Sequence, residues 1–179
     1  MPKRFIPPCE GELIVLRLLE KADLPLTLSW RNRDDIRKWF LNSDVIPEEK
    51  HRAWFEGYSG LDTDFVFIIL AKEPANTAVG QISLYNIDWI TGSAEYGRLM
   101  IGHPDARGKG YARHATNLLL RIGFEQLGLQ EIHLEVKEEN HPAHKIYLDC
   151  GFVETNRQNQ LVTMKITVPD WKRHSIGFR

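Results

Sequence analysis

Two glycines and three basic residues stand close together in the segment from residue 103 to residue 113. Its sequence reads HPDARGKGYAR, with glycine at 108 and 110 and a basic side chain at 107, 109 and 113. Because glycine lacks a side chain, several backbone N–H groups can converge here on one anion. A helix that begins behind the loop would add the positive end of its dipole. Chemistry of this kind suits a diphosphate.

Two common phosphate-binding motifs do not fit this loop. A P-loop needs four residues between its first glycine and a Gly-Lys pair that Ser or Thr follows. Here five residues separate Gly102 from Gly108 and Lys109, and Gly110 comes next. A dinucleotide-binding fingerprint needs a third glycine where Arg113 stands. A glycine-rich turn before a helix is also typical of a plain tight turn, so a purely structural role stays open at this point.

A carboxylate with a possible catalytic role lies downstream of the loop. Glu135 is predicted to lie mid-strand, on the face opposite Leu134 and Val136. In a sheet covered on both faces its carboxylate would be partly desolvated, which would raise its pKa and suit it to act as a base. A solvated strand glutamate is the simpler alternative. His141 and His144 lack a third ligand at metal spacing, so we predict no metal site.

Aromatic and basic residues are interleaved in the segment from Trp30 to Phe40, which reads WRNRDDIRKWF. An amphipathic helical stretch with Ile36 and Phe40 facing inward would explain this composition. Alternatively, the aromatic planes could stack on a sugar or a base while the arginines bind phosphate. The residues alone leave both interpretations open.

These groups need strands and helices to position them, and the periodicity of the apolar residues predicts both. Strands are expected at 13–19, 64–71, 79–86, 94–101, 131–136, 152–155 and 161–168, and helices at 24–32, 34–40, 48–58, 110–127 and 140–150. This order predicts an α/β (α+β) fold with a mixed, mostly antiparallel central sheet of about seven strands and helices on both faces. We expect one domain at 11–168, an N-terminal extension at 1–10 and a C-terminal tail at 169–179.

Composition supports one globular domain and narrows its partners. The chain has 179 residues, of which 42% are hydrophobic, and 23 basic against 24 acidic residues give a net charge of −1. This balance gives no reason to expect nucleic acid or an anionic membrane as a partner. Cys9 and Cys150 show no CxxC spacing, and no apolar run approaches the ~20 residues needed to cross a bilayer. We therefore expect a cytoplasmic protein with free thiols.

The spacing of Arg107, Gly110 and Ala112 matches the pattern Arg/Gln-x-x-Gly-x-Gly/Ala. With a strand before it and a helix after it, the segment resembles the acetyl-CoA loop of the GCN5-related N-acetyltransferase (GNAT) superfamily. The resemblance implies a sheet that splays between its fourth and fifth strands, with the pantetheine arm of acetyl-CoA in the gap. The cofactor-binding residues that it implies are Met100, Ile101, Gly102, Arg107, Gly108, Lys109, Gly110, Tyr111, Ala112, Arg113 and Asn140.

The same resemblance implies an acetyl-CoA-dependent N-acetyltransferase that acts by direct attack of a primary amine. Such a reaction needs a base to take a proton from the ammonium, and an acid can protonate the departing thiolate. Tyr147 and Glu135 match the acid and base positions of bacterial acetyltransferases that modify ribosomal-protein N-termini. Glu95 is the rival base because it lies on the strand that runs into the cofactor gap. A proton relay through water stays open as well.

The expected acceptor is a nucleotide-linked amino sugar. Trp30, Arg31 and Asn32, with further aromatic residues after them, are similar to enzymes that acetylate such sugars for bacterial surface polysaccharides, which implies a substrate-binding role for these three residues. A protein N-terminal amine, a polyamine and an aminoglycoside are the alternative acceptors. A CoA-binding regulatory module without catalysis and a scaffold with a merely structural glycine loop are alternatives of other classes. The sequence leaves open whether the chain forms a homodimer.

Overall fold

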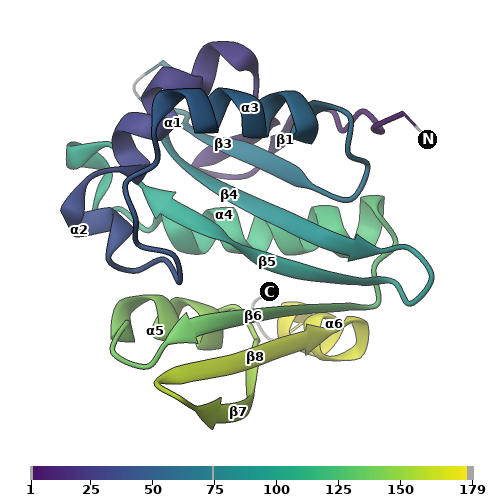
Figure 1. The fold of residues 1–179 in the computed structure, drawn as a ribbon. Coiled ribbons are helices and arrows are strands. Elements are labelled where there is room, and N and C mark those ends of the chain that lie inside the picture. The colour runs from purple at the N-terminus through teal and green to yellow at the C-terminus, as the bar shows by residue number, and fades with distance from the viewer. Residues whose placement is uncertain (1, 74, 177–179) are drawn as a thin grey trace.

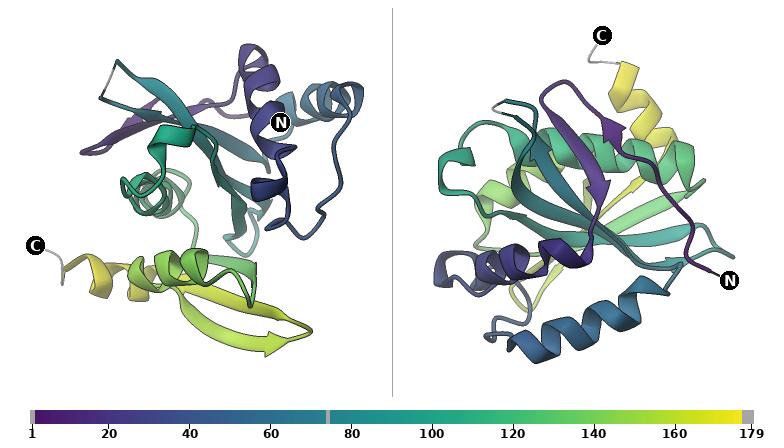
Figure 2. Two further views of the ribbon diagram at one scale, coloured as in Figure 1. Left: turned by 90° about the vertical axis from the view of Figure 1, so that its left-hand side faces the viewer. Right: turned by 90° about the horizontal axis from the view of Figure 1, so that it is seen from above.

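Strand β3 (Phe65–Ala71) requires a sheet that is covered on both faces. All but one of its seven residues are buried, and successive side chains of a strand point to opposite faces. The computed structural model, which describes residues 2–73 and 75–176, meets this requirement with helices on both sides of the sheet (Figure 1). Helices α1 (Leu24–Arg31) and α3 (Glu48–Ser59) lie on one side, and α4 (Tyr111–Arg121) lies on the other (Figure 2).

Across the described residues the sheet has eight strands in the order β1-β2-β3-β4-β5-β6-β8-β7. The other strands are β1 (Cys9–Glu10), β2 (Ile14–Leu18), β4 (Thr77–Asp88), β5 (Ser93–Ile101), β6 (Glu131–Lys137), β7 (Val153–Gln158) and β8 (Leu161–Thr167). Neighbours pair antiparallel except β5 and β6, which run parallel. The predicted mixed, mostly antiparallel sheet is confirmed, and the two-residue β1 is the strand that the sequence did not reveal.

The remaining helical segments connect the strands or close the chain. They are η1 (Lys21–Asp23), α2 (Asp34–Arg37), η2 (Pro104–Ala106), the π-helical η3 (Ile122–Gln126), α5 (His141–Asp149) and α6 (Val168–Ile176). The helix expected at 110–127 is thus an α-helix followed by a π-helical turn, and Gly128 (φ +71°) comes soon after it. Among the described residues, no helix combines the length and the apolar character that a membrane span would need.

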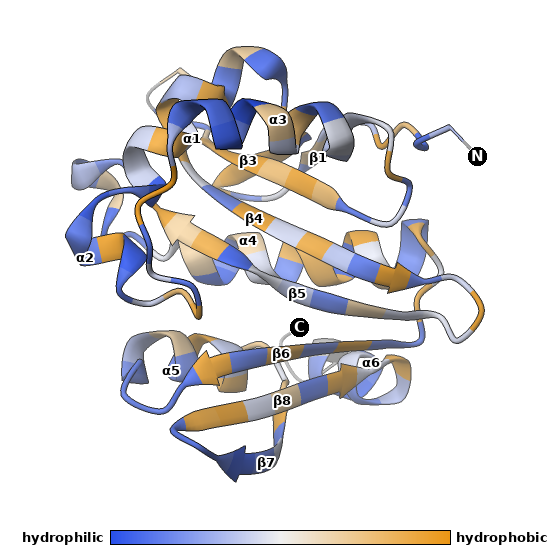
Figure 3. Cartoon of the chain, viewed as in Figure 1, coloured by the Kyte–Doolittle hydropathy of each residue, from blue (hydrophilic) through white to orange (hydrophobic). Residues whose placement is uncertain are grey.

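Hydropathy follows this layering (Figure 3). The inner strand β3 is apolar along most of its length, whereas the edge strand β7 is polar and each of its residues is exposed. A polar, exposed edge strand discourages pairing with the edge of another sheet. Residues 169–176, expected in a C-terminal tail, belong to α6, where the Trp171 ring lies 5.2 Å from that of Phe124. The last three residues of that tail lie outside the described part of the chain.

A gap between β5 and β6 is the feature of the fold that positions the site. The two strands pair only over 93–95 and 131–133, although β5 continues to Ile101 and β6 to Lys137. On its other edge, β5 departs from regular pairing with β4 near Gly97. There Arg98 has a φ of +52°, which is unusual for a residue with a side chain. The predicted splay of the sheet is confirmed.

Candidate active site

The loop between β5 and α4 is open at its glycines. Gly108 and Gly110 have φ values of +74° and +79°, in the left-handed region that glycine adopts readily. A Cβ atom at Gly108 would meet no atom within 4 Å, and residues 107–110 are all exposed. Gly110 is also the N-cap of the 11-residue helix α4, whose positive end therefore borders the loop. The geometry fits a diphosphate, as the glycine spacing predicts.

Arg107 joins this loop to the N-terminal helices. Its guanidinium forms an ion pair with the carboxylate of Asp35 on α2, which also accepts two hydrogen bonds from Arg33. The bonds from Arg33, and then that from Arg107, lower the pKa of Asp35 to about 2. Lys109 and Arg113 are exposed beside Arg107. Three basic residues therefore surround the open glycines, and one of them, Arg107, is held by an ion pair with Asp35 on α2.

The end of β5 is also fixed from the N-terminal helices. Arg33 Nη1 donates a hydrogen bond to the carbonyl oxygen of Gly102 at 2.6 Å. The indole of Trp30 packs so closely that a Cβ at Gly102 would come within 2.1 Å of its ring atoms. Met100 and Ile101 pair with β4 on one edge of the strand. Their other edge faces the gap toward β6, where the resemblance places the pantetheine arm.

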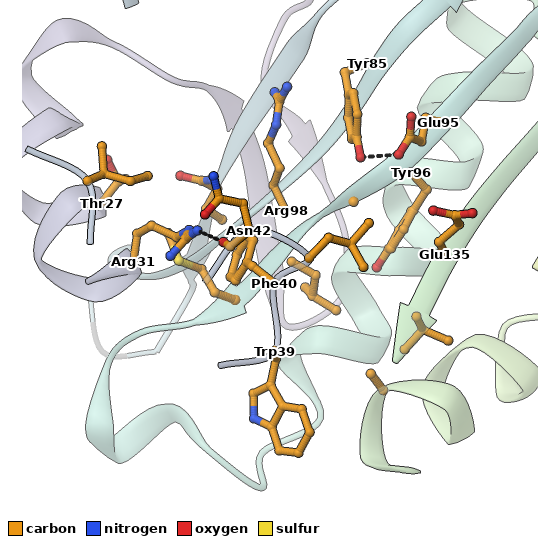
Figure 4. A pocket seen from close by; sticks show the side chains of 18 of the residues that line it. Thr27, Arg31, Trp39, Phe40, Asn42, Tyr85, Glu95, Tyr96, Arg98 and Glu135 are labelled. Atoms are coloured by element: carbon orange, nitrogen blue, oxygen red, sulfur yellow. Dashed lines mark hydrogen bonds between the residues drawn. The ribbon is translucent and has the colours of Figure 1, made fainter. Parts of the chain in front are cut away.

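A cavity of about 460 Å³ opens beside this gap. It is bounded by α1, α3, α5, strands β4, β5 and β6, and residues 39–46, which follow α2. The sequence-predicted site residues that line it are Arg31, Glu95, Met100, Glu135, Asn140 and Tyr147. Two different ends are evident in Figure 4. The carboxylates of Glu95 and Glu135 lie on one side, and Arg31 with Asn42 lies on the other.

Tyr147 reaches the cavity from α5. It is only 7% exposed, and its ring packs edge-on against Tyr96 and Phe152, with centroids 5.3 and 5.9 Å away. Burial raises the pKa of Tyr147 above its usual value, so the phenol keeps its proton over a wide pH range. Asn140 accepts a hydrogen bond from the Ala143 N–H at 3.3 Å and so caps the start of α5. The same asparagine lines the cavity.

Cys150 lies about one helical turn after Tyr147 and is fully buried. Burial raises the pKa of this thiol to about 12. A thiolate is the nucleophilic form of cysteine, so Cys150 is unreactive at neutral pH. Cys150 is therefore not suited to carry the acetyl group as a covalent intermediate. This is consistent with direct transfer of the acetyl group from acetyl-CoA to the amine.

Glu95 is a half-buried carboxylate that two donors hold in place. Tyr85 Oη donates to its Oε1 at 2.5 Å, and Asn86 Nδ2 donates to its Oε2 at 2.9 Å. Glu135 is exposed, and within the described part of the chain its carboxylate has no hydrogen-bond or ion-pair partner. The expectation that Glu135 would be partly desolvated is wrong, because the sheet is open at the gap and leaves this face of β6 uncovered.

Arg31 is a buried cation at the other end of the cavity. It is 9% exposed, its Nη2 donates to the Asn42 carbonyl oxygen at 2.5 Å, and its guanidinium lies 4.2 Å from the centre of the Phe40 ring. Its Nη1 is buried with no hydrogen-bond partner among the described residues. Burial lowers the pKa of Arg31, which reflects how poorly the charge is solvated there. A buried cation without a bound anion is costly, so this donor is set up to receive one.

Trp30 and Asn32, the neighbours of Arg31, do not line the cavity. Trp30 is 5% exposed and packs on Gly102. The Asn32 amide makes two 2.8 Å hydrogen bonds with the backbone of Ile46, one as donor and one as acceptor. Asn32 thus supports the segment that covers the cavity, and Trp30 packs on the end of β5. A direct role of Trp30 and Asn32 in substrate binding stays a prediction.

Sequence reasoning missed Tyr85, Arg98 and Lys50, all of which line the cavity. For Tyr85 a signal was available. It is the cross-strand partner of Glu95 in the β4–β5 hairpin, so counting back from the turn would have paired the two. No such signal was available for Arg98, because the direction of its side chain follows from an irregular backbone conformation with φ +52°.

Comparisons with known proteins agree with this geometry. The family model described as an acetyltransferase (GNAT) domain matches residues 14–153. A spermidine N(1)-acetyltransferase of Vibrio cholerae is 28% identical over 141 residues, which cover 79% of each chain. The crystal structure of the Vibrio cholerae spermidine N-acetyltransferase with CoA and spermine superposes with a TM-score of 0.82 at 26% identity, covering 90% of this chain and 99% of that one.

A second solved structure extends the similarity of the fold. The apo form of FdhC, a nucleotide-linked sugar GNAT, superposes with a TM-score of 0.80 and covers 98% of this chain and 97% of that one. Its identity to this chain is 20%, so the likeness concerns the fold alone. One fold therefore serves relatives with chemically different acceptors, and the acceptor has to be inferred from the cavity itself.

Proposed function

Because this chain belongs to the GNAT acetyltransferase family and transfers acetyl from acetyl-CoA to an amine, we propose that its acceptor is an anionic amine, with a nucleotide-linked amino sugar as the favoured class. The observation that carries this proposal is the buried, partly unpartnered guanidinium of Arg31, at the opposite end of the cavity from Glu95 and Glu135. An acceptor with an ammonium at one end and a negative group at the other would match both ends.

The cofactor's place follows from the chain's own residues. The open glycines at 108 and 110, the start of α4 and the surrounding cations would hold the diphosphate of acetyl-CoA. The unpaired edge of β5 at Met100 and Ile101 would hold the pantetheine arm. Acetyl-CoA supplies an activated acetyl group as a thioester.

Glu95 and Tyr147 have the properties that the two proton transfers require. Glu95 is half-buried and fixed by two hydrogen bonds, yet a carboxylate has four lone-pair positions and can still accept a proton from an ammonium. Tyr147 keeps its proton and can give it from Oη to the departing sulfur. We place Glu95 ahead of Glu135 as the base because Glu135 is exposed and unrestrained. Glu135 would then attract the ammonium as a second carboxylate.

The surroundings of Arg31 also suit a nucleotide. Lys50 and His51 line the same part of the cavity, and the His51 ring stacks on that of Trp54 with centroids 5.3 Å apart. Burial lowers the pKa of His51, which favours a neutral ring. Arginine and lysine bind phosphate, and aromatic planes stack on sugars and bases. Trp54 also stacks on Tyr58, with centroids 5.0 Å apart, so the ring of His51 is the aromatic plane that this group offers to a nucleotide.

A polyamine is the second candidate acceptor. Spermidine N-acetyltransferases are among the relatives, and Glu95 and Glu135 could bind ammonium groups. A polyamine, however, carries further positive charge along its length, and that charge would approach Arg31 and Lys50. Like charges in a partly buried site disfavour binding. The cavity thus selects against long polycations more than against amino sugars.

Free-thiol release from acetyl-CoA tests the proposal with matched acceptors. UDP-glucosamine, glucosamine, spermidine and a peptide with a free N-terminus would be compared by kcat/KM. We expect UDP-glucosamine to exceed glucosamine at least ~10-fold, because a charge-assisted hydrogen bond is worth about 1.5–3 kcal/mol. A preference for spermidine over both sugars would contradict the proposal and favour the polyamine reading.

Arg37 is the matched control for Arg31. Arg37 Nη1 donates to the Ser43 carbonyl oxygen at 2.7 Å, much as Arg31 donates to Asn42, but Arg37 does not line the cavity. Arg31→Met should remove most of the advantage of UDP-glucosamine over glucosamine, whereas Arg37→Met should keep it. Equal losses in the two variants would mean that Arg31 only supports the covering segment.

A further inference from the structure

The carboxylate end of the cavity contains residues to which the reaction assigns no role. Tyr85 on β4 is the cross-strand partner of Glu95 on β5, and the two side chains are joined by the 2.5 Å hydrogen bond seen in Figure 4. Asn86 bonds the other carboxylate oxygen at 2.9 Å. Each oxygen of Glu95 therefore has its own donor, so rotation of the carboxylate would break both bonds.

Gly97 provides the space that the Tyr85 ring needs. A Cβ atom at position 97 would lie 2.9 Å from Tyr85 Oη, closer than Cβ atoms approach in proteins, and 3.0 Å from its Cε1, which is tighter than most such contacts. Gly97 does not have a positive φ, so its backbone conformation does not demand glycine. The absence of a side chain is therefore explained by the tyrosine that lies over it.

Arg98 restrains the same ring from its face. Its guanidinium carbon lies 4.2 Å from the centre of the Tyr85 ring, within the range of a cation–π contact. Arg98 Nη1 in turn lies 2.7 Å from Oδ1 of Asp64, which is 8% exposed. The arginine is thus itself anchored, and the Tyr85 ring is limited in both position and tilt.

We propose that Tyr85 is a positioning residue for the acetyl transfer, which holds the Glu95 carboxylate toward the acceptor amine, and that Gly97 and Arg98 fix Tyr85 for this purpose. The proposal rests on the proposed role of Glu95 as the base. Burial, and next the hydrogen bond to Glu95, raise the pKa of Tyr85 above its usual value. The phenol therefore stays a donor wherever Glu95 works as a carboxylate.

A double-mutant cycle tests whether Tyr85 acts through Glu95. With the fastest of UDP-glucosamine, spermidine and the N-terminal peptide as acceptor, we expect Glu95→Gln to lower kcat about 100-fold and Tyr85→Phe about 10-fold. The double variant should be no slower than Glu95→Gln alone, within about twofold, because the residues act as a unit. A further 10-fold loss in the double variant would overturn the proposal.

Gly97→Ala provides a second variant for the same inference. It should lower kcat in the wild-type background by displacing the tyrosine ring. In a Tyr85→Ala background the space is free, and Gly97→Ala should then have no further effect. Equal losses in both backgrounds would mean that Gly97 matters for another reason and would contradict the inference.

Nuclear magnetic resonance of labelled tyrosine checks the contact without any acceptor. In Glu95→Gln the side-chain signal of Tyr85 should shift and its hydroxyl proton should exchange faster with water than in the wild type, because the 2.5 Å hydrogen bond to the carboxylate is lost. Tyr58 is the control. It is 3% exposed, bonds Val66 and does not line the cavity, so Tyr58→Phe should leave kcat unchanged.

The outcomes separate this inference from the proposed function. An unchanged signal and exchange rate of Tyr85 in Glu95→Gln would overturn the contact. Full kcat in Glu95→Gln would show that Tyr85 positions no base, while the preference for anionic acceptors could still hold. If the enzyme shows no preference for anionic acceptors but the double variant is no slower than Glu95→Gln, the acceptor proposal is wrong and the proposed role of Tyr85 still holds.

Discussion

In our proposal, the loop at residues 107–113 binds its ligand mainly through backbone N–H groups, whereas the acceptor cavity uses side chains from elements far apart in the sequence. The loop needs only two left-handed glycines and the start of α4. The cavity needs α1, residues 39–46, α3, β4, β5, β6 and α5 to lie correctly relative to one another. A site made of backbone is fixed by local sequence, while a site made of side chains depends on tertiary packing.

The two regions meet at Tyr147, where the largest effect is expected. Tyr147→Phe removes only the hydroxyl of a side chain that lines the cavity. We expect kcat to fall about 100-fold, the usual scale for general acid catalysis, with little change in the Kd of acetyl-CoA. Rapid-kinetic assays and calorimetry measure the two quantities separately. Unchanged turnover would remove Tyr147 from the mechanism.

The backbone nature of the cofactor loop is tested next. Gly110→Val places a β-branched side chain at φ +79°, which costs about 1–3 kcal/mol. If the loop must keep this conformation, the Kd of CoA should rise by roughly 10- to 100-fold. Gly128→Val is the control, because Gly128 has φ +71° and open space around it but lies outside the site. An equal weakening in both variants would indicate a global effect.

An Asn32 variant tests whether side-chain hydrogen bonds hold the acceptor cavity in shape. Asn32→Ala removes both hydrogen bonds to the Ile46 backbone and should lower the free energy of unfolding by about 1–2 kcal/mol. The KM of the acceptor should rise severalfold while the Kd of acetyl-CoA stays the same. Denaturant titration and steady-state kinetics check these expectations. A change confined to acetyl-CoA binding would reverse the assignment of the two regions.

The smallest effect is expected at Asp35, the carboxylate that joins the two regions. Asp35→Asn frees Arg107 from its ion pair, so CoA should bind about two- to fivefold more tightly at low salt. High salt should abolish the difference, since the groups are exposed. Asp34→Asn, which disturbs only the neighbouring pair with Arg37, should leave CoA binding unchanged. Weaker CoA binding in Asp35→Asn would mean that Asp35 holds Arg107 in its binding position.

The same contrast explains what the sequence could and could not predict. The glycine loop and the cap at Asn140 follow from local patterns, whereas the splayed sheet follows from the family resemblance, and each is present in the structure. Glu135 was expected to be partly desolvated but is exposed, because its environment depends on how far β5 and β6 separate. Trp30 and Arg31 are adjacent, yet one packs on Gly102 and the other borders the cavity. Residue type alone could not separate them.

Titration of UDP into the CoA-saturated protein tests the account's central claim most directly, because CoA would then occupy its proposed site and UDP would have to bind elsewhere, in the acceptor cavity. The account predicts that UDP binds the wild type and binds Arg31→Met about 10- to 100-fold more weakly, while spermidine binds neither tightly. Tight binding of spermidine with no binding of UDP would contradict it.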